Sequence, residues 1–100
     1  MQVNKTTVGT TLLIELVGRL DTASAAGVQA EIEALLKDDV KELVIDCERM
    51  DYLASSGLRI LLQLHKRMMD HGKMTIINVN EYVKEIFDMT GFSDVLNIEK

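Results

Sequence analysis

The side chains of this sequence that could do covalent chemistry are two adjacent serines, two histidines and one cysteine. Ser55 and Ser56 stand before Gly57 and an apolar run typical of a helix, and His65 and His71 fall in that helix or at its end. Catalysis by serine requires a base within hydrogen-bond reach of the hydroxyl. His65 would lie roughly 15 Å along the axis from Ser55, because a helix rises about 1.5 Å per residue. The spacing argues against a serine hydrolase, and we expect no catalytic residue.

Metal and cofactor sites are not predicted either. The two histidines are six positions apart and point in different directions on a helix, and Cys47 alone cannot complete a zinc site. Phosphate-binding glycine loops of the GxGxxG and GxxxxGK[ST] types do not occur in the sequence. Asp46 and Asp51 could come close together, but two carboxylates alone do not define a reaction. We therefore expect a protein that is not an enzyme and needs no metal or cofactor.

Composition and charge narrow the classes of partner. The net charge is −5 and the lysines and arginines are scattered, which argues against binding to nucleic acid. No apolar run approaches the roughly 20 residues that span a membrane, and the N-terminus lacks the apolar core of a signal peptide. The single cysteine fits a reducing compartment. We expect a cytoplasmic protein with one domain over residues 1–100.

Hydrophobic periodicity predicts a hairpin followed by βαβ units, and hence an α/β fold with a mixed sheet of four to five strands. The segment 11–17 carries apolar residues on both faces and is expected to be covered on both. The expected strands are residues 2–8, 11–17, 42–46 and 74–77, with a short edge strand at 95–98, and the expected helices are 21–37, 55–71 and a third helix that ends at Gly91. The acidic segment between residues 46 and 55 is expected to be a loop.

The sequence also predicts which residues cap the helices and which methionines lie in the core. Gly72 is predicted to be a left-handed cap of the second helix. Asn78 and Glu81 have the spacing of a capping box for the third helix. Asp21 is expected to cap the first helix. Three methionines are predicted to fill the core, namely Met68, Met69 and Met74.

The Ser-Ser-Gly triplet at residues 55–57 allows two interpretations. One serine could be the N-cap of the helix, a role worth about 1 kcal/mol. Two serines in a strand-to-helix turn exceed what capping requires, however. A helix N-terminus also favours an added phosphate, because its N–H groups are free and its dipole is positive there.

The segment Asp51-Tyr-Leu-Ala-Ser-Ser-Gly-Leu-Arg-Ile-Leu61 resembles the signature of STAS domains, specifically the stand-alone bacterial anti-sigma factor antagonists. Three further motifs resemble that family in the same order: Gly-Arg-Leu-Asp at 18–21, Leu-Val-Ile-Asp at 43–46 and Asp-Met-Thr-Gly-Phe at 88–92. The resemblance spans nearly the whole chain. It implies a single STAS-like domain.

The resemblance also implies a partner-switching cycle. The unmodified protein would bind an anti-sigma factor that is a serine kinase, and so free a sigma factor; the kinase would phosphorylate Ser55, and a PP2C-type phosphatase would reset the switch. Family members often have Asp or Ser where this chain has Ala54. The residues expected to contact the partner are Asp21, Asp46, Asp51, Leu53, Ser56, Gly57, Leu58 and Arg59.

An alternative stays open at this point. The chain could be a STAS interaction or ligand-sensing module of a larger signalling or transport assembly, without a kinase cycle. The exposed edge of the N-terminal hairpin could also pair with a second copy, so we expect a monomer or a weak dimer.

Overall fold

The computed structural model describes residues 1–99 and confirms the mixed α/β sheet. Within residues 1–99, no helix is both long enough and apolar enough to cross a lipid bilayer. The elements are β1 (Gln2–Val8), β2 (Thr11–Leu20), α1 (Thr22–Glu33), β3 (Glu42–Asp46), β4 (Met50–Leu53), α2 (Ser55–Met68), β5 (Lys73–Ile77), α3 (Glu81–Thr90) and the short 3₁₀ helix η1 (Phe92–Asp94).

The long strand β2 organises the sheet, whose order is β1-β2-β3-β5. Strand β1 pairs with β2 in antiparallel register from Gln2↔Val17 to Val8↔Thr11, which confirms the predicted hairpin. The first half of β2 pairs in parallel with β3. Its second half pairs in parallel with β4, after a register shift between Gly18 and Arg19. Gly18 has φ +103, a left-handed backbone that suits glycine at such an irregularity.

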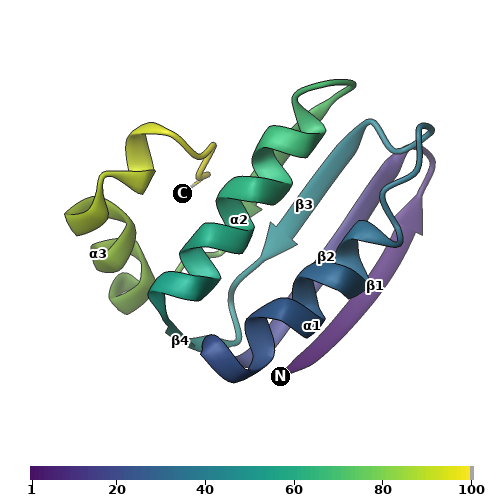
Figure 1. Ribbon diagram of the computed structural model, residues 1–100. Coiled ribbons are helices and arrows are strands. Elements are labelled where there is room, and N and C mark those ends of the chain that lie inside the picture. The colour runs from purple at the N-terminus through teal and green to yellow at the C-terminus, as the bar shows by residue number, and fades with distance from the viewer. Residues whose placement is uncertain (100) are drawn as a thin grey trace.

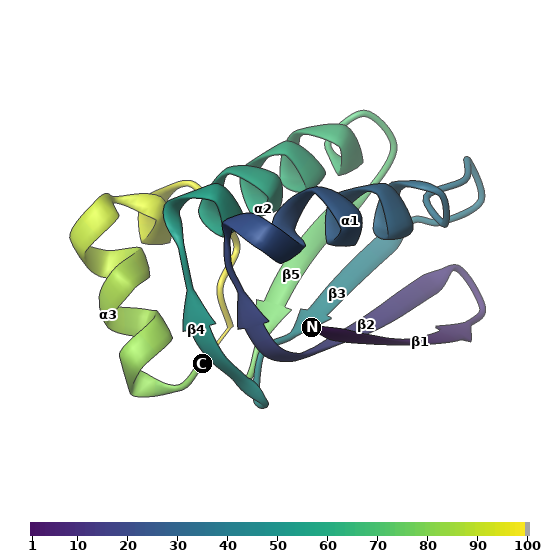
Figure 2. The ribbon, with the colours of Figure 1, turned by 60° about the horizontal axis from the view of Figure 1, so that its bottom comes forward.

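Helices α1 and α2 lie side by side on the same face of the sheet, while α3 lies beyond β4 (Figures 1 and 2). Under the two helices a row of isoleucines crosses three strands, since Ile14 pairs with Ile45 and Ile45 with Ile76, and all three are 0% exposed. Leu13 and Val17, on the other face of β2, are only half-buried. The expectation that β2 is covered on both faces is therefore wrong, because both long helices pack on one side.

The acidic segment after β3 is not all loop, because it contains β4. Met50 and Leu53 are buried at either end of this four-residue strand, and the polar Asp51 between them is exposed. A strand this short is stabilised by its pairing with the second half of β2 rather than by its own sequence. At the C-terminus, the expected edge strand at 95–98 is reduced to one bridge between Ile76 and Ile98.

Both early helices end sooner than the periodicity predicts. Helix α1 ends at Glu33 and α2 at Met68. Gly72 is not a left-handed cap: a Cβ there would lie 2.1 Å from the Lys41 carbonyl oxygen, so glycine is required by close approach of two backbones. Met69 is 65% exposed, so its predicted core role is wrong, whereas Met68 and Met74 are buried as predicted.

The N-cap of α3 is Asn80, two residues after the predicted Asn78. Asn80 Oδ1 accepts a hydrogen bond from the Val83 N–H at 2.8 Å, and its Nδ2 donates to the Met50 carbonyl oxygen at 2.8 Å. One side chain thus caps α3 and fastens it to β4. Asn78 instead has φ +57, and the predicted end of the helix at Gly91 is confirmed by its left-handed backbone, φ +80.

Two glycines should respond in opposite directions to the same substitution. We expect Gly72→Ala to lower the free energy of unfolding by about 2 kcal/mol, because overpacking costs roughly 1–3 kcal/mol and the clashing atom is backbone. Gly27→Ala, inside α1, should raise it by about 0.5–1 kcal/mol, since a Cβ there meets nothing within 4 Å. Urea unfolding followed by circular dichroism measures both, and a loss of stability in Gly27→Ala would contradict this packing.

Candidate functional site

Two helices begin next to one another at one edge of the sheet. Strands β2 and β4 are parallel neighbours, so α1 and α2, which follow them, start on the same side. The Thr22 Oγ1 and Ser56 Oγ atoms are 3.2 Å apart and share a hydrogen bond, although 34 positions separate them. The candidate site is the rim formed by these two helix starts. We call residues 54–57 the serine turn.

Ala54, and neither serine, is the N-cap of α2. Its backbone is extended, at φ −89 and ψ 169, and no side chain caps this end of the helix. Its N–H donates to the Leu20 carbonyl oxygen at 2.9 Å, and its carbonyl oxygen accepts from the Leu58 N–H at 3.0 Å. Ser55 is therefore the first helical residue. The interpretation that one serine is only the cap is wrong.

Ser55 is exposed, and within residues 1–99 its hydroxyl makes no hydrogen bond. A hydroxyl in this position can meet another protein without giving up an internal contact. Ser56 differs, because it is half-buried and bonded to Thr22. Of the two serines, Ser55 is therefore the one whose hydroxyl is exposed and free of hydrogen bonds among the described residues.

Gly57 sets the position of the serine turn against the sheet. It is buried, and a Cβ there would lie 2.8 Å from Leu20 Cγ, 2.8 Å from Leu53 Cδ1 and 3.0 Å from the Leu20 carbonyl oxygen. Leu53 and Leu58 are themselves only 4% and 5% exposed. These three residues place the turn through packing, and a direct contact of any of them with a partner stays a prediction.

Asp21 caps α1 in a reciprocal capping box with Ser24, as its place in the sequence predicts. The Ser24 N–H donates to Asp21 Oδ1 at 3.1 Å, and the Asp21 N–H donates to Ser24 Oγ at 3.0 Å. The Ser24 backbone hydrogen bond is the main cause that lowers the pKa of Asp21 from 3.8, with Arg19 as the smallest contributor.

Arg19 and Tyr52 join the rim, although sequence reasoning assigned them no role. The Arg19 guanidinium carbon lies 4.1 Å from the centroid of the Tyr52 ring, and Arg19 Nε is 3.6 Å from Asp21 Oδ2. Arg19 stands inside the Gly-Arg-Leu-Asp motif, which was a usable signal. The contact of Thr22 with Ser56 had no signal in the sequence, because it depends on how α1 and α2 pack against each other.

The remaining residues predicted to contact a partner are Asp46, Asp51 and Arg59. Asp46 ends β3, and its Oδ1 accepts from the Glu48 N–H at 3.0 Å and from Asn78 Nδ2 at 3.2 Å. Asp51 and Arg59 are exposed. Asp46 and Asp51 stand on different strands, at the end of β3 and within β4, and the suggestion that they form a carboxylate pair stays a prediction.

Among residues 1–99, neither histidine nor Cys47 is hydrogen-bonded to Ser55. Burial, helped by the neighbouring Asp46 charge, raises the pKa of the Cys47 thiol to about 12, so it stays protonated at neutral pH. His65 Nδ1 and His71 Nε2 are buried and lack a hydrogen-bond partner within residues 1–99. In the same residues no three His, Cys, Asp or Glu side chains are grouped to hold a metal ion.

The topology defines an α/β domain whose candidate site is a rim where two helices begin. The family model described as the STAS domain matches residues 2–100. The chain therefore belongs to the STAS domain family, as the resemblance predicted.

Several similar proteins are named anti-sigma factor antagonists. BtrV of Bordetella bronchiseptica, whose name assigns it provisionally to the anti-sigma factor antagonists, is 28% identical over 88 residues, covering 87% of this chain and 76% of BtrV. The anti-sigma F factor antagonist of Paenibacillus polymyxa is 27% identical over 89 residues, with coverage of 87% and 76%. The unphosphorylated anti-sigma factor antagonist SpoIIAA has a TM-score of 0.76 at 20% identity over 99% of this chain and 88% of its own. The phosphorylated form, from Bacillus, has a TM-score of 0.75 at 20% identity, with coverage of 99% and 92%.

The uncapped start of α2 predicts how three variants will behave. Ala54→Ser and Ala54→Asp should each raise the free energy of unfolding by about 1 kcal/mol, because they supply the missing cap. Ser55→Ala should change it by less than about 0.5 kcal/mol, as expected of an exposed side chain without a special role. Urea unfolding at neutral pH measures all three. A loss of about 1 kcal/mol or more in Ser55→Ala would show that Ser55 is the cap after all.

The capping carboxylate of Asp21 predicts a dependence on pH. A pKa lowered by folding stabilises the fold above the unfolded value of 3.8 and ceases to do so as the pH falls through the lower folded value. Asp21→Asn keeps a capping side chain but cannot titrate there. We expect the urea midpoint of wild type to fall more steeply than that of Asp21→Asn between neutral pH and pH about 3. Asp39→Asn, at an exposed loop position, controls for the loss of one negative charge; parallel pH profiles for wild type and Asp21→Asn would contradict the assignment.

Proposed function

We propose that this chain is an anti-sigma factor antagonist, a non-enzymatic switch whose binding to an anti-sigma factor serine kinase is controlled at Ser55. The observation that carries the proposal is the Ser55 hydroxyl, which is exposed and unbonded within the described chain and stands at the start of a helix that it does not cap. The names given to its relatives BtrV and the P. polymyxa antagonist support the same role.

In the proposed cycle the unmodified chain binds the kinase and thereby releases a sigma factor. The kinase then transfers the γ-phosphoryl group of ATP to Ser55 Oγ. The new bond joins that oxygen to phosphorus, the bond to the β-phosphate oxygen breaks, ADP leaves, and the hydroxyl proton passes to a base of the kinase. A PP2C-type phosphatase hydrolyses the phosphoserine and restores the hydroxyl.

The helix start explains why a phosphate at Ser55 need not disturb the fold. The first N–H groups of α2 have no side-chain cap, and the helix dipole favours a negative charge there. The unphosphorylated and phosphorylated forms of SpoIIAA both share the fold of this chain, with TM-scores of 0.76 and 0.75. The effect of the phosphate is therefore expected at the interface rather than inside the chain.

Added negative charge would explain why phosphorylation of Ser55 weakens binding to the partner. A phosphate adds about −1.5 to −2 charges to a chain whose net charge is already −5. A partner surface that fits the unmodified hydroxyl would lose packing and meet a strongly negative group. A ten-thousandfold loss of affinity requires only about 5.5 kcal/mol. Charge repulsion and lost packing at one exposed serine can reach that size.

The test is quantitative affinity capture from the native cell with wild-type, Ser55→Ala and Ser55→Asp baits. We expect wild type and Ser55→Ala to hold an ATP-binding kinase, and Ser55→Asp to lose it. Gln63→Glu, an exposed position further along α2, controls for one added negative charge.

The captured kinase is then purified and supplied with ATP, and phosphate is located by mass spectrometry. Phosphate on Ser55 in wild type, and none on Ser55→Ala, is the expected result. Equal recovery of the same proteins by all the baits would refute the switch and favour a STAS module of a larger assembly without a kinase cycle.

A further inference from the structure

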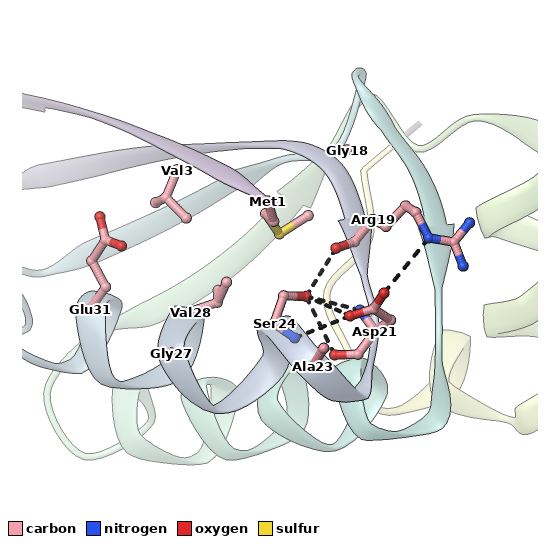
Figure 3. A pocket seen from close by; sticks show the side chains of 10 residues that line it. All are labelled: Met1, Val3, Gly18, Arg19, Asp21, Ala23, Ser24, Gly27, Val28 and Glu31. Carbon is pink, nitrogen blue, oxygen red and sulfur yellow. Dashed lines mark hydrogen bonds and ion pairs between the residues drawn. The ribbon is translucent and has the colours of Figure 1, made fainter.

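An open groove of about 650 Å³ runs between β1 and α1, on the side of α1 that faces away from α2. Figure 3 shows Met1 and Val3 on its strand side and Ala23, Gly27 and Val28 on its helix side. This volume lies within the range of about 300–1,000 Å³ that is usual for binding pockets. Its lining is mainly apolar in the middle, with charged side chains at the ends.

Gly27 is not explained by the fold of the isolated chain. It lies inside α1, where glycine is the poorest helix former after proline. Its φ is not in the left-handed region, and a Cβ would meet nothing within 4 Å. Neither backbone conformation nor internal packing requires glycine here. What glycine does provide is an open wall of the groove, where another chain can approach the helix backbone closely.

One acidic side chain of the groove has no ion pair. Within residues 22–33, α1 holds Glu31 and Glu33 and no lysine or arginine. Glu33 is paired with Arg67 at 3.6 Å, whereas Glu31, which lines the groove, makes no ion pair within residues 1–99. At the other end, Arg19 is already engaged by Asp21 and the Tyr52 ring. A ligand that pairs with Glu31 should therefore carry a basic side chain at this end of the groove.

The groove is continuous with the serine turn through the first turn of α1. Asp21 and Ala23 line the groove, and Thr22 between them bonds to Ser56 on the other side of the helix. A protein that covers Ser55 reaches the groove by crossing the exposed Ala23.

From these observations we propose that the β1–α1 groove is a second docking site for the partner that binds the serine turn. Its occupant is a segment of that partner which inserts an apolar side chain beside Gly27 and places a lysine or arginine near Glu31. The identity of the partner rests on the proposed function, whereas the chemistry of the segment rests on the groove alone.

The first test probes that chemistry without the partner. The nitrogen-15-labelled chain is titrated with a short amphipathic helical peptide of leucine and lysine, and with a matched peptide of leucine and glutamate. We expect the lysine peptide to shift the amide signals of Ala23, Gly27 and Val28. Gly27→Leu should fill the groove and weaken binding by about tenfold or more.

Two variants make that test specific. Ala30→Leu adds a similar side chain at an exposed position of α1 that does not line the groove, and should bind as wild type does. Glu31→Lys should weaken the lysine peptide selectively. Leucine favours helix, so Gly27→Leu should keep the fold, as its thermal midpoint will show. Shifts that arise elsewhere, or that persist in Gly27→Leu, would overturn the proposal.

The second test uses the kinase recovered with the wild-type bait, with Gly27→Leu, Ala30→Leu and Ser55→Asp compared side by side. Loss of binding in Gly27→Leu and Ser55→Asp, but not in Ala30→Leu, supports both docking sites. If only Ser55→Asp loses the kinase, the groove is refuted and the switch stands. If only Gly27→Leu loses it, the switch is refuted and the groove stands.

Discussion

The pairing of one ten-residue strand, β2, with three others is the constraint on which the rest of this structure depends. Its first half holds β3, and its second half, after the irregularity at Gly18, holds β4. Parallel strands deliver the helices that follow them to the same edge of the sheet. Because β2 leads into α1 and β4 into α2, this pairing brings both helix starts together. Without the second half of β2, the short β4 would have no partner strand and the serine turn no fixed position.

Packing, and not capping, holds the start of α2. Gly57 lets the helix press against Leu20 and Leu53, and the Ala54 N–H continues the ladder to β2. Helix starts usually gain stability from a side-chain cap, and α1 has a complete one in Asp21 and Ser24. Helix α2 has no side-chain cap, and its first residue is a serine whose hydroxyl is exposed and unbonded within the described chain. Local rules of stability are commonly broken at functional sites, and the contrast between the two helices follows that pattern.

Much of this architecture could be predicted because strands 2–8, 42–46 and 73–77 carry their own periodicity and turn signals. The part that could not be predicted depends on distant contacts. Strand β4 needs β2, and the choice between Asn78 and Asn80 as a cap depends on a left-handed backbone at Asn78. Sequence alone could not tell whether Ser55 is the N-cap or the first helical residue, because the two differ by one position and helix ends are hard to place that closely. The structure makes Ala54 the cap. The motif located the serine turn, but only the three-dimensional placement of Thr22 showed which hydroxyl is engaged.

If the serine turn and the groove bind one partner, the two contacts have separate tasks. A contact that is equally strong in both states of a switch cannot change the ratio between them. The groove lies on the side of α1 away from α2, so we expect its apolar wall to be unaffected by a phosphate on Ser55. It would therefore add affinity to both states, while Ser55 alone would set their ratio. Affinity and switching could then be adjusted independently, the first at Gly27 and Glu31 and the second at the serine turn.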